Sequence, residues 1–134
     1  MINYDELIRK ATEARELSYS PYSSFKVGAA LLCDDGEIFT GCNIENASYS
    51  LTVCAERVAF SKAVSAGKRN FVAIAILGGK DKISDFLYPC GACRQVLSEL
   101  CNSDLEIILF DGEKRKLCTL GQIFPSSFSK NDIK

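Results

Sequence analysis

The chain of 134 residues contains no histidine. Histidine is the commonest protein ligand of transition metals, so a metal centre in this chain has to be held by thiolates. Seven cysteines are available for that purpose. A zinc ion held by three thiolates keeps a fourth coordination position open, and an open position is typical of a catalytic rather than a structural site.

The chain also lacks any large excess of charge, because its formal net charge is −1. Without a dominant basic patch, a strong electrostatic affinity for nucleic acid is not indicated. No apolar stretch approaches the roughly 20 residues of a membrane span. The N-terminus, Met1–Glu6, is polar and acidic and does not resemble a secretory signal. We therefore expect a cytoplasmic protein that binds neither nucleic acid nor membranes.

No repeat, low-complexity segment or linker divides the chain. Its hydrophobic fraction of 47% and charged fraction of 25% are ordinary for a globular protein. A chain of this length suits one domain whose core is large enough to fold without disulfides. We predict a single domain over residues 1–134.

The spacing of the apolar residues predicts helices and strands in alternation. Helices are expected over 4–17, 53–66 and 91–101, and strands over 25–33, 37–44, 71–77, 105–110 and 115–120. Asp35-Gly36 is a hairpin signal between the first two strands. This order of elements predicts an α/β fold, a three-layer α/β/α sandwich around a mixed five-stranded sheet. The third and fourth strands are expected to be parallel, joined by a right-handed crossover.

The cysteines fall into two groups. Their odd number rules out complete internal pairing, and in a reducing cytosol a Cys-x-x-Cys pair usually means metal or redox chemistry. Four lie within apolar runs and are expected to be buried as small hydrophobic residues: Cys33, Cys42, Cys101 and Cys118. The remaining three are the candidate metal ligands: Cys54, Cys90 and Cys93.

Both candidate metal-binding segments open predicted helices. Cys54 is expected in the first turn of the 53–66 helix, and Cys90 and Cys93 at the start of the 91–101 helix. Helix N-termini carry partial positive charge, which favours thiolate over thiol. Three thiolates and one zinc ion sum to −1, so neighbouring cations are expected to compensate. The candidates are Arg57 and Arg94.

Glu56 follows Cys54 by two residues. Residues i and i+2 do not share a helix face, but Glu56 can flank the metal if the helix end points into a pocket. There it would take a proton from bound water and deliver it to a substrate, as a base and then an acid. A carboxylate at a helix start is also favourable to the helix dipole, and that role can coexist with catalysis.

Two other interpretations of the cysteines stay open at this point. Cys90 and Cys93 could form a thioredoxin-like redox pair, which would leave Cys54 unexplained. A structural zinc site needs four ligands, so one of the four cysteines in apolar runs would have to serve.

Two motifs together resemble the cytidine deaminase family, in its short homotetrameric branch with three cysteine zinc ligands. They are Cys54-Ala55-Glu56-Arg57 and Pro89-Cys90-Gly91-Ala92-Cys93-Arg94-Gln95. The segments 20–30 and 41–49 are also similar to the family pattern, and the resemblance extends from the N-terminal helix to Phe128. It implies one Zn²⁺ per subunit held by the three cysteines, with Glu56 as the proton shuttle. Hydroxide would attack C4 of cytosine and ammonia would leave.

The resemblance also implies the substrate contacts. Phe25 would pack against the base, and Asn43 and Glu45 would bond the ribose 3′-hydroxyl, for which a carboxylate beside an amide is suited. The backbone around Ala55 and Cys90 would read the base edge. Phe128 would reach into a neighbouring subunit's pocket, so the active site would be composite in a homo-oligomer, a tetramer. The tail Ile123-Phe124-Pro125-Ser126-Ser127-Phe128 departs from the family's usual Leu-Pro-x-x-Phe-like ending.

The leading functional prediction is hydrolytic deamination of cytidine and 2′-deoxycytidine, in pyrimidine salvage. One alternative is a blasticidin-type aminonucleoside deaminase, which shares the zinc motifs and the chain length. Another, from a different class, is a zinc-stapled binding module without catalysis. The near-neutral charge disfavours a polynucleotide-editing role.

Overall fold

The computed structural model describes residues 1–133 and contains one five-stranded sheet with the strand order β2-β1-β3-β4-β5. β3 and β4 are parallel, and every other neighbouring pair is antiparallel. The bounds are β1 Lys26–Cys33, β2 Ile38–Cys42, β3 Phe71–Gly79, β4 Glu106–Phe110 and β5 Arg115–Thr119. The predicted mixed sheet is confirmed, as is the hairpin at Asp35-Gly36, where Gly36 takes a φ of +93°.

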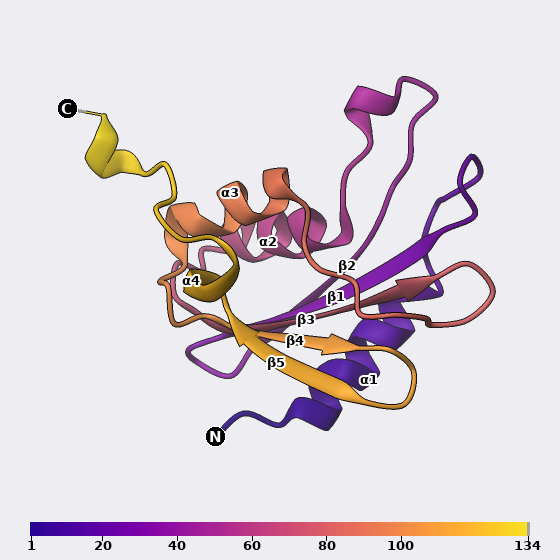
Figure 1. Ribbon diagram of the computed structural model, residues 1–134, viewed down its shortest axis with the longest axis horizontal. Coiled ribbons are helices and arrows are strands. Elements are labelled where there is room, and N and C mark those ends of the chain that lie inside the picture. Colours follow the sequence, from indigo (N-terminus) through magenta and orange to yellow (C-terminus); the bar gives the residue numbers. More distant parts are fainter. Residues whose placement is uncertain (134) are drawn as a thin grey trace.

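Helices cover both faces of this sheet (Figure 1). The three main helices are α1 Tyr4–Arg15, α2 Ala55–Ser65 and α3 Gly91–Leu100. α1 packs on one face, and α2 and α3 lie side by side on the other. A short helix, α4 Leu120–Ile123, and two 3₁₀ turns, η1 Tyr49–Leu51 and η2 Lys130–Asp132, complete the described elements. The predicted three-layer α/β/α sandwich is therefore confirmed.

β3 is the central strand, and it is buried on both faces because each face meets a helix layer. Its side chains alternate between the two layers. Ala73 and Ala75 belong to the cluster that contains Leu7 and Ala11 of α1, whereas Ile74 and Ile76 belong to the cluster beneath α2 and α3. The almost wholly apolar composition of this segment follows from that position.

The predicted end of the first helix was wrong, and one short helix near the C-terminus was missed. α1 ends at Arg15 instead of 17, since the Leu17 amide turns back to the Ala14 carbonyl and the Leu17 side chain is 78% exposed. α4 was missed, although its capping box, in which the Thr119 hydroxyl and the Gln122 amide bond each other's backbone N–H, is a helix-start signal. Two of the four cysteines expected in the core, Cys42 and Cys118, are half-buried rather than buried; the other two are buried.

Two loops project beyond the sheet near the start of α2, over residues 16–25 and 43–54 (Figure 1). They are joined by the Glu45 carboxylate, which accepts hydrogen bonds from the backbone N–H groups of Tyr22 and Ser23 and from the Ser23 hydroxyl. The Tyr22 and Tyr49 rings also meet edge to face, with their centroids 6.1 Å apart. The two loops are therefore held together as one structural unit.

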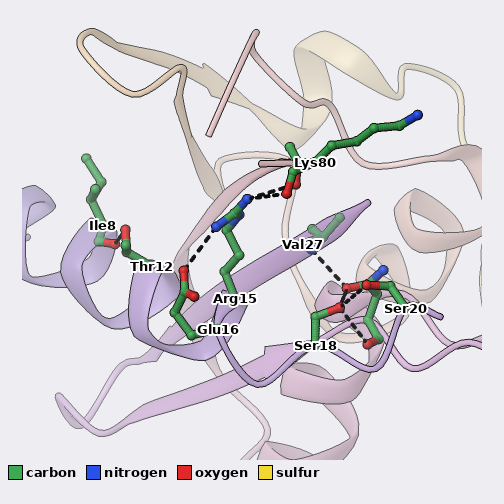
Figure 2. A network of polar contacts seen from close by, with 10 residues as sticks. Ile8, Thr12, Arg15, Glu16, Ser18, Ser20, Val27 and Lys80 are labelled. Carbon is green, nitrogen blue, oxygen red and sulfur yellow. Dashed lines mark hydrogen bonds and ion pairs between the residues drawn. The ribbon is translucent and has the colours of Figure 1, made fainter. Parts of the chain in front are cut away.

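The C-terminal end of α1 is held by a buried arginine, shown in Figure 2. Nη2 of Arg15 donates to the carbonyl oxygens of Gly79 (2.8 Å) and Lys80 (3.1 Å). These bonds tie the end of α1 to the end of β3, where the chain leaves the sheet toward the Cys90 turn. Among residues 1–133, no helix is long and apolar enough to cross a membrane.

Gly28 tests the packing of α1 on the sheet. A Cβ at this position would lie 2.0 Å from the Ala11 carbonyl oxygen and 2.7 Å from the Arg15 amide nitrogen, so the helix backbone would have to move. We expect Gly28→Ala to lower the free energy of unfolding by about 1–3 kcal/mol, measured by urea denaturation. Gly91→Ala is the matched control, because no heavy atom lies within 4 Å of its added Cβ. Equal unfolding midpoints would contradict the close packing.

Candidate active site

Three cysteine sulfur atoms converge where α2 and α3 begin, at the same end of the two helices (Figure 1). The Sγ atoms of Cys54, Cys90 and Cys93 all lie within 4.8 Å of one another. Cys54 Sγ and Cys90 Sγ are 3.9 Å apart, and Cys90 Sγ and Cys93 Sγ are 3.4 Å apart. Among residues 1–133 this is the one group of three or more cysteine, aspartate or glutamate side chains arranged to hold a metal ion.

Local structure explains why the sulfurs meet. Cys54 and Cys90 are both N-cap residues with extended backbone, at ψ 152° and 170°, so each side chain lies just before its helix instead of along it. This corrects the prediction that Cys54 lies inside the first turn. The Cys90 sulfur accepts a hydrogen bond from the Cys93 amide at 3.5 Å, as N-cap side chains do. Cys93, three residues on, then brings its sulfur to the same place.

The charge distribution suits a metal ion. The adjacent Cys93 thiol, with smaller contributions from Arg57 and Cys90, lowers the pKa of Cys54 to about 5 despite its burial. The proximity of Cys54, together with burial, raises the pKa of Cys93. A thiolate-binding cation would displace the protons of the thiols that it binds. Three soft ligands without a fourth fit a zinc ion with one open position.

Of the two arginines expected to compensate this charge, only Arg57 lies against the sulfurs. Its Nη2 is 3.8 Å from Cys54 Sγ and 3.3 Å from the Thr52 carbonyl oxygen, and the Cys54 thiolate raises the pKa of Arg57. Arg94 instead donates to the carbonyl oxygens of Pro89 (2.7 Å) and Ile123 (2.5 Å). The expectation for Arg94 was wrong because the helix turn directs its side chain away from the cluster.

Glu56 is buried beside the sulfurs, with 5% of its surface exposed. Burial raises the pKa of its carboxyl to about 7, and the negative charge of Cys54 acts in the same direction. Because Cys54 precedes the helix, Glu56 in the first turn can share its cavity. The i, i+2 obstacle anticipated from a regular helix therefore does not arise.

A hollow of about 170 Å³ adjoins the cluster and has a mostly apolar lining. Its residues are Val27, Asn43, Thr52, Cys54, Ala55, Glu56, Leu87, Tyr88 and Cys90. Asn43 and Ala55 were predicted substrate contacts, and the structure brings both to this hollow. Val27, Thr52, Leu87 and Tyr88 were missed. Leu87 and Tyr88 directly precede the Pro89-Cys90 turn, so their nearness to the metal-binding motif was the available signal.

Asn43 is largely committed to holding the backbone around it. Its Oδ1 accepts from the Val27 amide at 2.9 Å and from the Ser18 hydroxyl at 2.5 Å, and its Nδ2 donates to the Phe25 carbonyl at 2.8 Å. Figure 2 shows Ser18 with Ser20 and Val27 in this network. One N–H of the Asn43 amide is left for a ligand.

The other predicted substrate contacts lie outside this hollow. Glu45 borders a neighbouring hollow of about 360 Å³ with Tyr22, Ser23, Tyr49 and Thr52, and Thr52 is common to both hollows. Phe25 is half-buried and is tied to the site through its carbonyl. Phe128 is 58% exposed and does not line the hollow at the cysteines.

The family model described as the cytidine and deoxycytidylate deaminase zinc-binding region matches residues 1–108. The chain belongs to this family. The predicted family, zinc cofactor and enzyme class are thereby confirmed, with the three-cysteine group placed to hold the ion.

Individual relatives agree with this assignment. A cytidine deaminase from Sporosarcina psychrophila is 46% identical over 134 residues, which cover 98% of this chain and 96% of the relative. The solved structure of a cytidine deaminase from Burkholderia pseudomallei has a TM-score of 0.88 and 45% identity, over 95% of this chain and 100% of that one. A blasticidin-S deaminase from Bacillus cereus is 30% identical over 131 residues, covering 94% of this chain and 92% of the relative.

The first prediction for the site concerns zinc content. Cys90→Ser should lower the zinc bound per chain from one to well below one after dialysis, because a hydroxyl is a poor replacement for a thiolate ligand. Cys118→Ser, which alters a half-buried cysteine on β5 outside the cluster, should retain one zinc. Zinc is quantified by atomic emission. Equal zinc loss in both variants would contradict the three-cysteine centre.

The second concerns pH and the zinc-free protein. Since the folded pKa of Glu56 is raised from 4.5 to about 7, its favourable contribution is complete below pH 4.5 and is lost as pH rises through 7. Glu56→Gln should therefore unfold with a free energy higher than wild type by about 1 kcal/mol at pH 5 and about 3 kcal/mol at pH 8.5. Urea denaturation in chelator and reductant measures both. The exposed Glu99→Gln is the control, and a pH-independent gap for Glu56→Gln would contradict the buried carboxyl.

Proposed function

We propose that this chain is a zinc-dependent hydrolase that converts cytidine and 2′-deoxycytidine to uridine and 2′-deoxyuridine with release of ammonia. The observation that carries the proposal is a buried carboxyl, Glu56, bordering a hollow beside three convergent cysteine sulfurs. Its support also includes membership of the deaminase family and the cytidine deaminases among the similar proteins.

Cys54, Cys90 and Cys93 would hold the zinc. When bound by three ligands, zinc keeps one position open and activates water as a nucleophile near neutral pH. Three thiolates carry one more unit of charge than Zn²⁺ balances, and the excess would weaken that activation. Arg57, which contacts Cys54, and the N-termini of α2 and α3 supply the positive charge that offsets it.

Glu56 would manage the protons. Deamination adds water to C4 of the cytosine ring and expels the amino group, so both protons of the water have to move, one to N3 of the ring and one to the departing nitrogen. A carboxylate that borders the hollow can accept each proton from the water oxygen and deliver it to the ring nitrogen and then to the leaving amino group. Its burial keeps bulk water from competing for the proton.

The sugar and the base of the substrate would contact the two projecting loops and the lining of the hollow. The free N–H of Asn43 and the carboxylate of Glu45 suit a sugar hydroxyl, since one donates and the other accepts. The backbone at Ala55, which lines the hollow, would read the base edge, and Phe25 would pack against the base. Glu45 is already bonded to Tyr22 and Ser23, so a sugar would meet a preorganised acceptor.

We also infer a homotetramer in which Phe128 enters a neighbouring subunit's site. Support comes from the large apolar side chains exposed on the two projecting loops and on the tail, a pattern typical of interaction surfaces. They are Leu17, Tyr19, Tyr22, Ile44, Tyr49, Leu51, Phe128 and Ile133.

The setting we propose is pyrimidine salvage in the cytoplasm, by a single catalytic domain over residues 1–134. The seven free cysteines support a reducing compartment. One sheet with a packed helix layer on each face supports one domain. Lys134, the last residue of the predicted domain, lies outside the described residues.

The test is ammonia release from cytidine with zinc measured on the same sample. Glu56→Gln should retain zinc and fold but lower kcat roughly 10²- to 10⁴-fold, the usual contribution of a positioned proton carrier. Glu99→Gln, an exposed residue of α3, is the matched control and should keep wild-type turnover.

Three outcomes would contradict the proposal. Near-normal turnover by Glu56→Gln would remove the proton role of Glu56. Activity of the wild-type protein on blasticidin S but not on cytidine would identify it as a deaminase of the antibiotic. Zinc binding without turnover of either compound would identify it as a binding module without catalysis.

A further inference from the structure

The cysteine motif on α3 ends in two residues, Arg94 and Gln95, that the proposed chemistry does not use. The Arg94 guanidinium spans two carbonyls that are far apart in the sequence. Its Nε donates to the Pro89 oxygen at 2.7 Å, and its Nη1 donates to the Ile123 oxygen at 2.5 Å. Pro89 directly precedes Cys90, and Ile123 is the last residue of α4. Arg94 therefore joins the metal-binding turn to the start of the C-terminal tail.

Gln95 holds the tail at a second point. Its Nε2 donates to the Phe128 carbonyl oxygen at 2.9 Å, while the Phe128 side chain remains 58% exposed. The backbone of this residue is thus fixed on its own subunit, and the ring is free to contact another chain.

Beyond Phe124 the tail has few other anchors. Ile123 and Phe124 are partly buried against the core, but no residue from 125 to 133 is buried, and none of them packs against either core cluster. A polar hollow of about 440 Å³ separates part of α3, at Ser98 and Glu99, from Ser129–Asn131. Since apolar burial contributes little beyond Phe124, the hydrogen bond from Gln95 carries a large share of the attachment of residues 125–133, and Arg94 fixes the point at Ile123 from which they extend.

We propose that Arg94 and Gln95 are positioning residues that hold the C-terminal tail, and through it the Phe128 ring, at a fixed place relative to the cysteine site. The inference rests on the proposed function, in which Phe128 completes the site of a neighbouring subunit. The first turn of α3 then fixes two parts of the subunit. One is the metal-binding turn, which serves the subunit's own site, and the other is the Phe128 ring, which serves the site of the neighbouring subunit. Loss of either residue frees the ring before substrate binds and weakens binding, not proton transfer.

The kinetic test uses Gln95→Met, which keeps side-chain length and removes the N–H donor. We expect KM for cytidine to rise about three- to tenfold, the effect of one neutral hydrogen bond, with kcat within about twofold of wild type. Phe128→Ala should raise KM as well, and adding Gln95→Met to it should change KM by less than about twofold. Arg94→Lys should act in the same direction, because a lysine cannot span both carbonyls.

Lys62→Met is the matched control, since it removes a side-chain hydrogen bond to the Thr40 carbonyl from α2 without touching the tail. Its KM should equal that of wild type. Additive effects of Gln95→Met and Phe128→Ala would overturn the proposal, because Gln95 would then act independently of the ring. An unchanged KM in Gln95→Met would overturn it as well.

A second readout is independent of activity. Backbone amides of Phe124 and of residues 126–130 should exchange hydrogen faster in Gln95→Met and Arg94→Lys than in wild type or Lys62→Met, with all proteins loaded with zinc. Unchanged exchange would overturn the anchoring. If the wild-type protein fails to deaminate cytidine, the proposed function falls, and this measurement alone still decides whether the two residues hold the tail.

Discussion

The direct packing of α2 on β2 is the constraint on which the site depends. A Cβ at Gly41 would lie 2.4 Å from the Ala55 carbonyl oxygen and 2.6 Å from the Ala59 amide nitrogen, so strand and helix touch backbone to backbone. This contact fixes the first turn of α2 on the sheet, and with it the N-cap residue Cys54. α3 lies beside α2 on the same face, so its own N-cap, Cys90, arrives at the same place.

Placing both helix starts together also sets the electrostatics of the site. Two N-termini and Arg57 offer positive charge to a group of thiols that has to lose protons to bind a cation. The same crowding buries Glu56 and raises its pKa, because the carboxylate is both desolvated and close to the charge on Cys54. The separate features of the site therefore have one structural origin.

The polar network around Asn43 fixes the part of the site that is proposed to bind the substrate. By bonding the backbone of Val27 and Phe25 and the hydroxyl of Ser18, its amide joins the start of β1 to the end of β2. Glu45, two residues on, ties the two projecting loops together. Asn43 and Glu45, which are proposed to bind the sugar, thus also hold the backbone around the site in place.

Much of this could be predicted from the sequence, because it depends on local pattern. The apolar run over 71–77 indicated a strand covered on both faces, and the alternation of elements indicated the sandwich. The absence of histidine required thiolate ligands, and Cys54, Cys90 and Cys93 were the candidates because the other four cysteines lie in apolar runs; the position of the three at helix starts was visible in the spacing. The error at Leu17 is an error of a helix boundary, where one backbone hydrogen bond decides, whereas α4 was missed although its capping box is a local signal.

Only the tertiary structure decided which charged side chains meet the sulfurs. Arg57 and Arg94 each stand beside a ligand in the sequence, yet one contacts Cys54 and the other turns to Pro89 and Ile123. Leu87 and Tyr88 likewise join the hollow only because the chain folds back after β3. The sequence by itself determined the ligand chemistry and the layers, since these follow from residue type and periodicity. The direction of each side chain depends on the helix ends and on packing between distant segments, which no local pattern records.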